Sequence, residues 1–148
     1  MTGPVFADSS AVAKLYADEP GADDVRQAPH FVVSQLARVE VPAALWRKHR
    51  MGEITAADTA VLVGAFEADY FGTPDAPPRF LVLAVTADVL ENAARLVGVH
   101  GLRAYDGVQL ASAITARTAV GEGVAMASFD KALSAAAAAE RLDLLVEP

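Results

Sequence analysis

Five short runs of β-branched or aromatic residues, separated by stretches long enough for helices, constrain the fold of this 148-residue chain most strongly. The intervening stretches repeat apolar residues at a spacing near 3.6, which is typical of helices that pack through one face. Parallel strands require helix-length connections of this kind. The pattern therefore predicts one α/β domain over residues 1–148, a three-layer α/β/α sandwich around a mostly parallel sheet of about five strands. The expected strands are residues 4–7, 30–33, 80–85, 124–128 and 142–146.

Composition excludes several classes of function. The absence of cysteine rules out a disulfide framework, a thiolate zinc site and a cysteine nucleophile. A net charge of −7 argues against a protein that coats duplex nucleic acid through bulk positive charge. The sequence has no uncharged stretch near the roughly 18 residues of a membrane span, and residues 1–8 lack the basic start of a secretory signal. We therefore expect a cytoplasmic protein.

Two aspartates lie at the carboxyl ends of expected strands. Asp8 comes after the first strand, and Asp130 comes after the fourth, just before a helix expected to begin at Lys131. The carboxyl ends of parallel strands meet at one edge of a sheet, where open α/β folds bind their ligands. Aspartate is also a favoured helix cap, so plain capping is the alternative at both positions.

Two further acids lie in expected helices. Asp106 opens a helix expected over residues 103–119, where an acid that stabilises the helix dipole is the alternative. Glu40 belongs to a helical hairpin expected over residues 35–71, and Pro42 should kink this helix or mark its first turns. A carboxylate beside an apolar face is costly unless it is paired. The apolar stripe expected next to Glu40 is formed by Leu36, Val39, Ala43 and Trp46.

Convergence of these four acids would have a chemical reason. Two carboxylates 4 Å apart repel by roughly 4 kcal/mol at an effective dielectric constant of about 20, and a divalent cation removes that repulsion. Oxygen ligands without His or Cys favour Mg²⁺ or Mn²⁺, ions that bind phosphate oxygens and activate water. Asp8, Glu40, Asp106 and Asp130 therefore predict a metal site that hydrolyses phosphodiester bonds.

Four segments carry a resemblance to a known family. In chain order they are residues 8–21, 38–45, 103–111 and 128–131. Together they resemble the PIN-domain ribonucleases, in particular the VapC-type toxins of bacterial toxin–antitoxin pairs. Each motif alone is weak, but the four occur in the family's order and span almost the whole chain.

The resemblance implies a PIN-like fold, bound Mg²⁺ or Mn²⁺, endonucleolytic cleavage of RNA, a homodimer and a VapB-like antitoxin. It implies that Asp8, Glu40, Asp106 and Asp130 are the catalytic, metal-holding acids, with Ser128 and Ser10 as supporting hydroxyls. Two positions depart from the family pattern. Ala43 stands where many relatives carry Asn, and Gly107 stands where many carry Ala. We expect the glycine to loosen the helix start by up to about 1 kcal/mol.

The segment Arg47-Lys48-His49-Arg50 is the only basic cluster in the sequence. Arg47, Lys48 and Arg50 are therefore candidate RNA contacts, although a solvated helix end is an equal alternative. Lys14 could either reach the acids or pair with Asp18 at the i, i+4 spacing of a helix.

A receiver-like signalling module, or a degenerate α/β domain that only binds a partner, is the rival interpretation. A receiver would carry paired acids after the first strand, an acceptor Asp after the third strand and a Lys after the last. Here Asp8 stands alone, Asp88 lies three residues past Val85, and no Lys follows the last strand. A degenerate domain that only binds a partner is disfavoured because all four acids, Asp8, Glu40, Asp106 and Asp130, are present.

Overall fold

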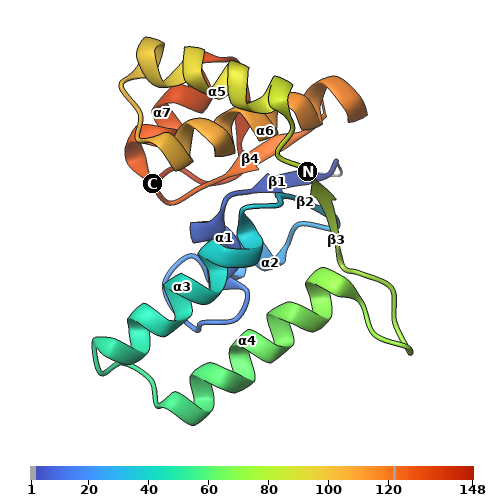
Figure 1. The fold of residues 1–148 in the computed structure, drawn as a ribbon, viewed down its shortest axis with the longest axis vertical. Helices are drawn as coiled ribbons and strands as arrows, with labels where there is room; N and C mark the ends of the chain where they lie inside the picture. Colours follow the sequence, from blue (N-terminus) through green and yellow to red (C-terminus); the bar gives the residue numbers. More distant parts are fainter. Residues whose placement is uncertain (1–2, 122) are drawn as a thin grey trace.

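The computed structural model describes residues 3–121 and 123–148 (Figure 1). At its centre lies a five-stranded sheet in the order β3-β2-β1-β4-β5, in which every neighbouring pair is parallel. This arrangement confirms the predicted α/β fold and all five expected strands. The strands are β1 (Val5–Ala7), β2 (Phe31–Ser34), β3 (Phe80–Leu83), β4 (Ala125–Ala127) and β5 (Asp143–Leu144).

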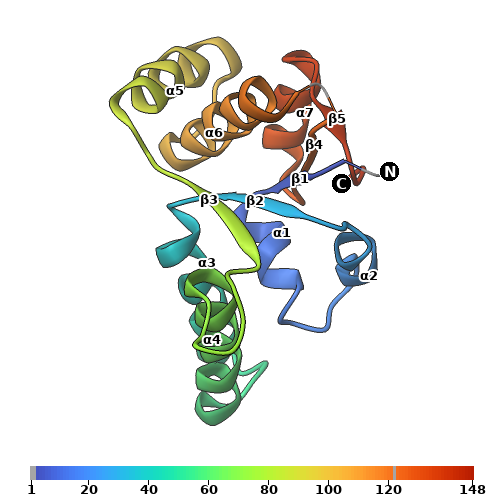
Figure 2. The ribbon, with the colours of Figure 1, turned by 90° about the vertical axis from the view of Figure 1, so that its right-hand side faces the viewer.

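Helices cover both faces of the sheet and make the three layers visible in Figure 2. One face carries α5, α6 and α7, and the other carries α1 to α4. The helices are α1 (Ser9–Lys14), α2 (Ala22–Arg26), α3 (Ala37–Arg50), α4 (Ala56–Phe71), α5 (Ala87–His100), α6 (Ala104–Val120) and α7 (Lys131–Ala139). None of them is long and apolar enough to cross a bilayer.

Alternation along the strands builds a separate core in each helical layer. Phe6 and Met126 face α5 to α7, whereas Val5, Ala7 and Ala127 face α1, α3 and α4. The residues of β1 and β4 are at most 1% exposed, as expected for strands that are covered on both sides. The carboxyl ends of these two strands are thereby held at one rigid edge.

The α3–α4 hairpin projects from the sheet (Figure 1) and corrects one detail of the sequence analysis. The helix α3 continues through Pro42 to Arg50. Its buried face consists of Ala37, Val41 and Leu45, whereas Val39 is 71% exposed. The stripe predicted from Leu36, Val39, Ala43 and Trp46 was therefore wrong. Helical periodicity fits two adjacent stripes in this segment, and contact with the sheet selects the other one.

Gly107 serves close packing between α5 and α6. A Cβ atom at this position would lie 2.4 Å from Cγ1 of Val97 and 3.2 Å from the carbonyl oxygen of Ala93. The glycine therefore lets the two helices approach, which offsets the conformational cost expected from it.

Candidate active site

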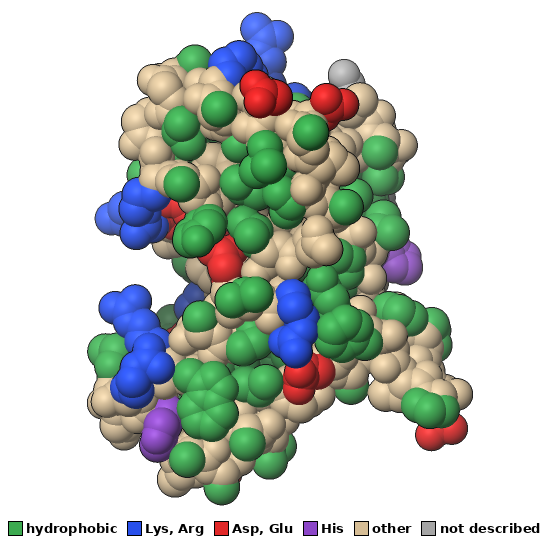
Figure 3. Space-filling view, viewed as in Figure 1, with side chains coloured by type: hydrophobic (Ala, Val, Ile, Leu, Met, Phe, Trp, Pro, Cys, Tyr) green, Lys and Arg blue, Asp and Glu red, His purple; other side chains and the backbone are tan. Residues whose placement is uncertain are grey.

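The four predicted acids all line one pocket of about 230 Å³. Asp8 caps α1 and Asp130 caps α7, while Glu40 and Asp106 lie in the first turns of α3 and α6. The positive ends of these helix dipoles offset part of the repulsion among the carboxylates. The surface is notched between the start of α6 and the helix α3, with Lys and Arg side chains on both sides of the notch (Figure 3).

Asp8 is the most buried of these acids, with 4% exposure. Its Oδ1 accepts hydrogen bonds from Ser10 Oγ at 2.7 Å and from the Ala11 amide at 2.9 Å, and its Oδ2 accepts from Ser128 Oγ at 2.6 Å. Burial raises the pKa of Asp8 to about 6, and the nearby charge of Asp106 adds to the rise, although the three hydrogen bonds oppose it. A bound cation would stabilise this desolvated carboxylate in its ionised form.

The two predicted supporting hydroxyls both contact Asp8 and also bind the loop that follows β4. Ser10 Oγ accepts from the Phe129 amide at 3.1 Å, and Ser128 Oγ accepts from the Asp130 amide at 3.1 Å. Each hydroxyl therefore donates to Asp8 and accepts from the backbone beside Asp130. This pair of bridges fixes the start of α1 against the start of α7.

Glu40 is held by two side chains that the sequence analysis did not single out. Its Oε1 accepts from Gln109 Nε2 at 2.7 Å and from Ser9 Oγ at 2.9 Å. Gln109 is 3% exposed and lies one helical turn after Asp106. The three-residue spacing, which places Gln109 on the same helix face as Asp106, was the one sequence signal for its role. Its partner Glu40 lies 69 positions away in the sequence, so only the folded structure reveals the contact.

Gln109 also carries an unsatisfied polar atom. Its buried Oε1 has no hydrogen-bond partner among the described residues. An unpaired buried acceptor is costly, so this side chain has hydrogen-bonding capacity beyond its contacts with Glu40 and Ser9.

Arg103 links the remaining two acids and was also missed. Its Nε donates to Asp106 Oδ2 at 3.0 Å, and its Nη2 donates to Asp130 Oδ2 at 3.2 Å. The side chain is 80% exposed, so it reaches across the pocket mouth from the solvent side. One cation is therefore already shared by two of the four carboxylates.

The donor set fits a hard divalent ion. The acids of the pocket supply only oxygen ligands, which are the ligands that Mg²⁺ and Mn²⁺ prefer. Within residues 3–121 and 123–148, no three His, Cys, Asp or Glu side chains already lie close enough together to form a metal cluster. Arg103 accounts for part of the separation between the carboxylates, because its guanidinium lies between Asp106 and Asp130. An ion bound by both acids would have to displace it.

Two of the three candidate RNA-contact residues lie next to the acid pocket. Arg47 and Lys48 line a second pocket beside the acids, whereas Arg50 does not line it. Lys14 neither pairs with Asp18 nor bonds to an acid of the pocket: it pairs with Glu19 at 3.1 Å.

Comparisons with known proteins bear on the fold. No family model matches the sequence, and no curated protein matches it. Among solved structures, the chain is similar to one described as "Toxin-antitoxin complex from Klebsiella pneumoniae", with a TM-score of 0.56 and 16% sequence identity. The match covers 86% of this chain and 87% of that one. The likeness shows the fold. It extends over nearly the full length of both chains.

Proposed function

We propose that this chain is the toxin of a type II toxin–antitoxin pair and acts as a PIN-domain, VapC-type endoribonuclease that requires Mg²⁺ or Mn²⁺. The observation that carries this proposal is the convergence of four carboxylates, from the starts of four helices, around one pocket. The fold likeness to a chain of a toxin–antitoxin complex supports the toxin role.

Asp8, Asp106 and Asp130 would hold the ion, with Glu40 bound to it directly or through water. When bound, the ion supplies an activated water and stabilises the charge that develops on the phosphate. The protein supplies orientation: Ser10 and Ser128 hold both oxygens of the Asp8 carboxylate. Gln109 and Ser9 hold Glu40 in the same way. Asp8 and Glu40 are thus fixed before substrate binds, which limits the reorganisation that these two acids need during reaction.

The pairing of Arg103 also supports an inhibitory route for a VapB-like antitoxin. A guanidinium already fits between Asp106 and Asp130 in this fold. An arginine inserted by the partner would pair with the same carboxylates and compete with the ion. The homodimer implied by the family resemblance remains part of this proposal.

The receiver-like alternative gains no support from the geometry. Asp88, its candidate acceptor, lies in the first turn of α5 and is exposed. It does not line the pocket that contains Asp8.

Replacing Arg103 by Gln is expected to tighten Mn²⁺ binding by about two- to five-fold, because the ion no longer competes with an exposed guanidinium. Titration calorimetry of the wild type and R103Q measures the difference. Arg95→Gln is the matched control, since Arg95 is also exposed but does not line the acid pocket. Weaker binding in R103Q would mean that Arg103 helps to form the ion site.

Expression without a partner is expected to arrest growth, and Asp130→Asn is expected to relieve the arrest. Asparagine remains a good helix cap, so the start of α7 is retained while one carboxylate is lost. Growth curves with matched protein levels test the toxin role. Asp58→Asn is the control, because Asp58 lies in the first turn of α4 outside the acid pocket. A folded D130N protein that inhibits growth like the wild type would disconnect toxicity from this site.

A further inference from the structure

A second pocket, which we call the flanking groove, lies beside the acid pocket. Its volume is about 400 Å³, within the usual range for ligand sites. Ser10 and Ala44 line both hollows, so the flanking groove adjoins the acid pocket. One part of its lining is apolar and includes Met51 and Phe129, and Met51 is 63% exposed.

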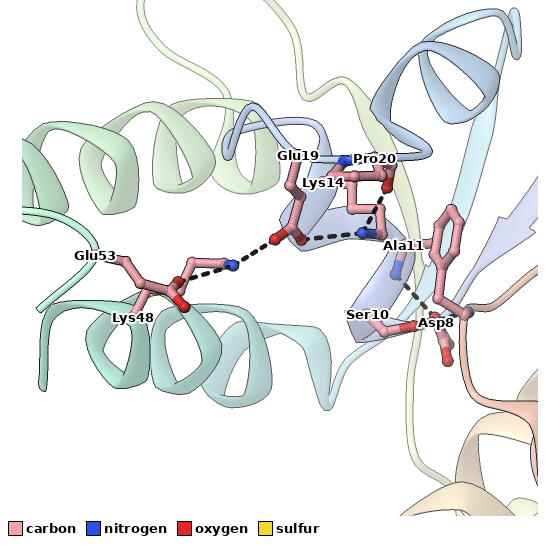
Figure 4. Close-up of polar contacts among 9 residues, drawn as sticks. Asp8, Ser10, Ala11, Lys14, Glu19, Pro20, Lys48 and Glu53 are labelled. Carbon is pink, nitrogen blue, oxygen red and sulfur yellow. Dashed lines mark hydrogen bonds and ion pairs between the residues drawn. The ribbon is translucent and has the colours of Figure 1, made fainter. Parts of the chain in front are cut away.

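A chain of ion pairs runs along the other part of the lining (Figure 4). Lys14 Nζ lies 3.1 Å from Glu19 Oε1, and Lys48 Nζ binds Glu19 Oε2 and lies 3.5 Å from Glu53 Oε2. Lys14 also donates to the carbonyl oxygen of Pro20 at 2.8 Å. Burial alone would raise the pKa of Glu19, but the two ammonium groups outweigh it and lower that pKa.

These contacts fix two lysines that would otherwise be flexible. The side chains of Lys14 and Lys48 are only 13% and 21% exposed. A ligand that binds to preordered cations loses less side-chain entropy than one that must order them. The groove is lined by three cationic side chains, Lys14, Lys48 and Arg47, and by two carboxylates. Its net charge is therefore positive, whereas that of the acid pocket is negative.

Phe129 ties the flanking groove to the candidate active site. It lies between Ser128 and Asp130 in the chain, and its ring centroid is 4.4 Å from Lys14 Nζ. On another side the ring abuts Gly21, where a Cβ atom would lie 2.5 Å from the ring and where φ is 93°. The ring therefore lies against the Lys14 ammonium group and packs close to the backbone of Gly21, where any side chain would collide with it.

We infer that the flanking groove binds one nucleotide of a single-stranded RNA, adjacent to the phosphodiester that lies over the acid pocket. This inference rests on the proposed function. A phosphate beside the scissile one would meet Arg47 and Lys48, and the base would pack against the apolar lining of Met51 and Phe129. Aromatic and cationic side chains side by side are the usual platform for unpaired nucleotides. The groove thus supplies an electrostatic attraction for RNA that the four carboxylates of the acid pocket cannot supply.

The test uses two matched arginines of α3. Both Arg47 and Arg50 are exposed, but only Arg47 lines the flanking groove. Binding of a fluorescein-labelled single-stranded RNA is measured by anisotropy at low salt in EDTA, so that no cleavage is required. Arg47→Gln is expected to weaken binding by about three- to ten-fold and to reduce the salt slope by about 0.7, as for one lost phosphate contact on a single strand. Arg50→Gln should change binding less than two-fold, within about the effect expected for an exposed charge.

A second variant tests the apolar part. Phe129→Leu retains an apolar side chain but removes the aromatic face, so binding should weaken at least about five-fold. Circular dichroism establishes that each variant is folded.

Four outcomes separate the inference from the proposed function. Equal weakening by R47Q and R50Q, or no RNA binding in EDTA, would overturn the groove. If the wild type cleaves RNA but the R47Q and F129L variants bind RNA as tightly as the wild type does, the inferred nucleotide site is wrong and the nuclease proposal stands. Groove-dependent binding by a protein that never cleaves RNA would support the groove and overturn the nuclease proposal.

Discussion

Replacing Asp106 by Asn is expected to slow RNA cleavage by at least about 100-fold. Loss of a group that only orients a metal ligand typically costs 10- to 100-fold, and Asp106 would contact the ion itself. The substitution preserves side-chain size and leaves an oxygen that can still accept from Arg103. Initial rates on a labelled RNA in Mn²⁺, compared with the wild type, measure the effect.

Asp88→Asn is the matched control for this variant. Asp88 occupies the first turn of α5 as Asp106 occupies the first turn of α6, but it lies outside the acid pocket. Its loss should leave cleavage within about two-fold of the wild type, as expected for an exposed charge. Comparable rates for D106N and D88N would show that Asp106 takes no part in the reaction.

The stability of the metal-free protein is expected to fall by about 2 to 3 kcal/mol through Asp8 as the pH rises from about 4 to 8. The pKa of Asp8 is raised in the folded state from 3.8 to about 6. The favourable contribution of the protonated carboxyl is therefore complete below pH 3.8 and is lost as the pH rises through about 6. Above that pH, folding requires a buried, ionised carboxylate.

Urea unfolding of the wild type and Asp8→Asn in EDTA isolates this effect from the titration of other acids. The difference in unfolding free energy should shift in favour of D8N as the pH rises, because Asn carries no charge to desolvate. Addition of Mn²⁺ near pH 8 should stabilise the wild type more than D8N. Parallel pH profiles in EDTA would contradict the assigned ionisation of Asp8.

The convergence of the acids was predictable because topology alone imposes part of it. Asp8 directly follows β1, Asp130 comes three residues after the end of β4, and these strands are adjacent and parallel. Capping, the alternative interpretation, also holds: Asp8 accepts from the Ala11 amide and Asp130 from the Leu133 amide. Capping and convergence are thus compatible, since the starts of α1 and α7, which Asp8 and Asp130 cap, both open onto the same pocket.

Other features depended on contacts that local spacing does not encode. The pairing of Lys14 with Asp18 assumed a continuous helix, but α1 ends at Lys14, so the i, i+4 rule does not apply and Glu19 is the partner. The bond from Gln109 to Glu40 joins α6 to α3. Arg103 lies near Asp106 in sequence, yet its second contact, with Asp130, depends on the placement of α7.

The central claim is that the four carboxylates bind a divalent ion, and Mn²⁺ titration calorimetry tests it most directly. The wild type should give a saturable isotherm near neutral pH. A folded Asp8→Asn, Asp106→Asn double variant should lose it, because two of the three aspartates proposed to hold the ion are gone. A full-strength isotherm in the double variant would contradict the claim.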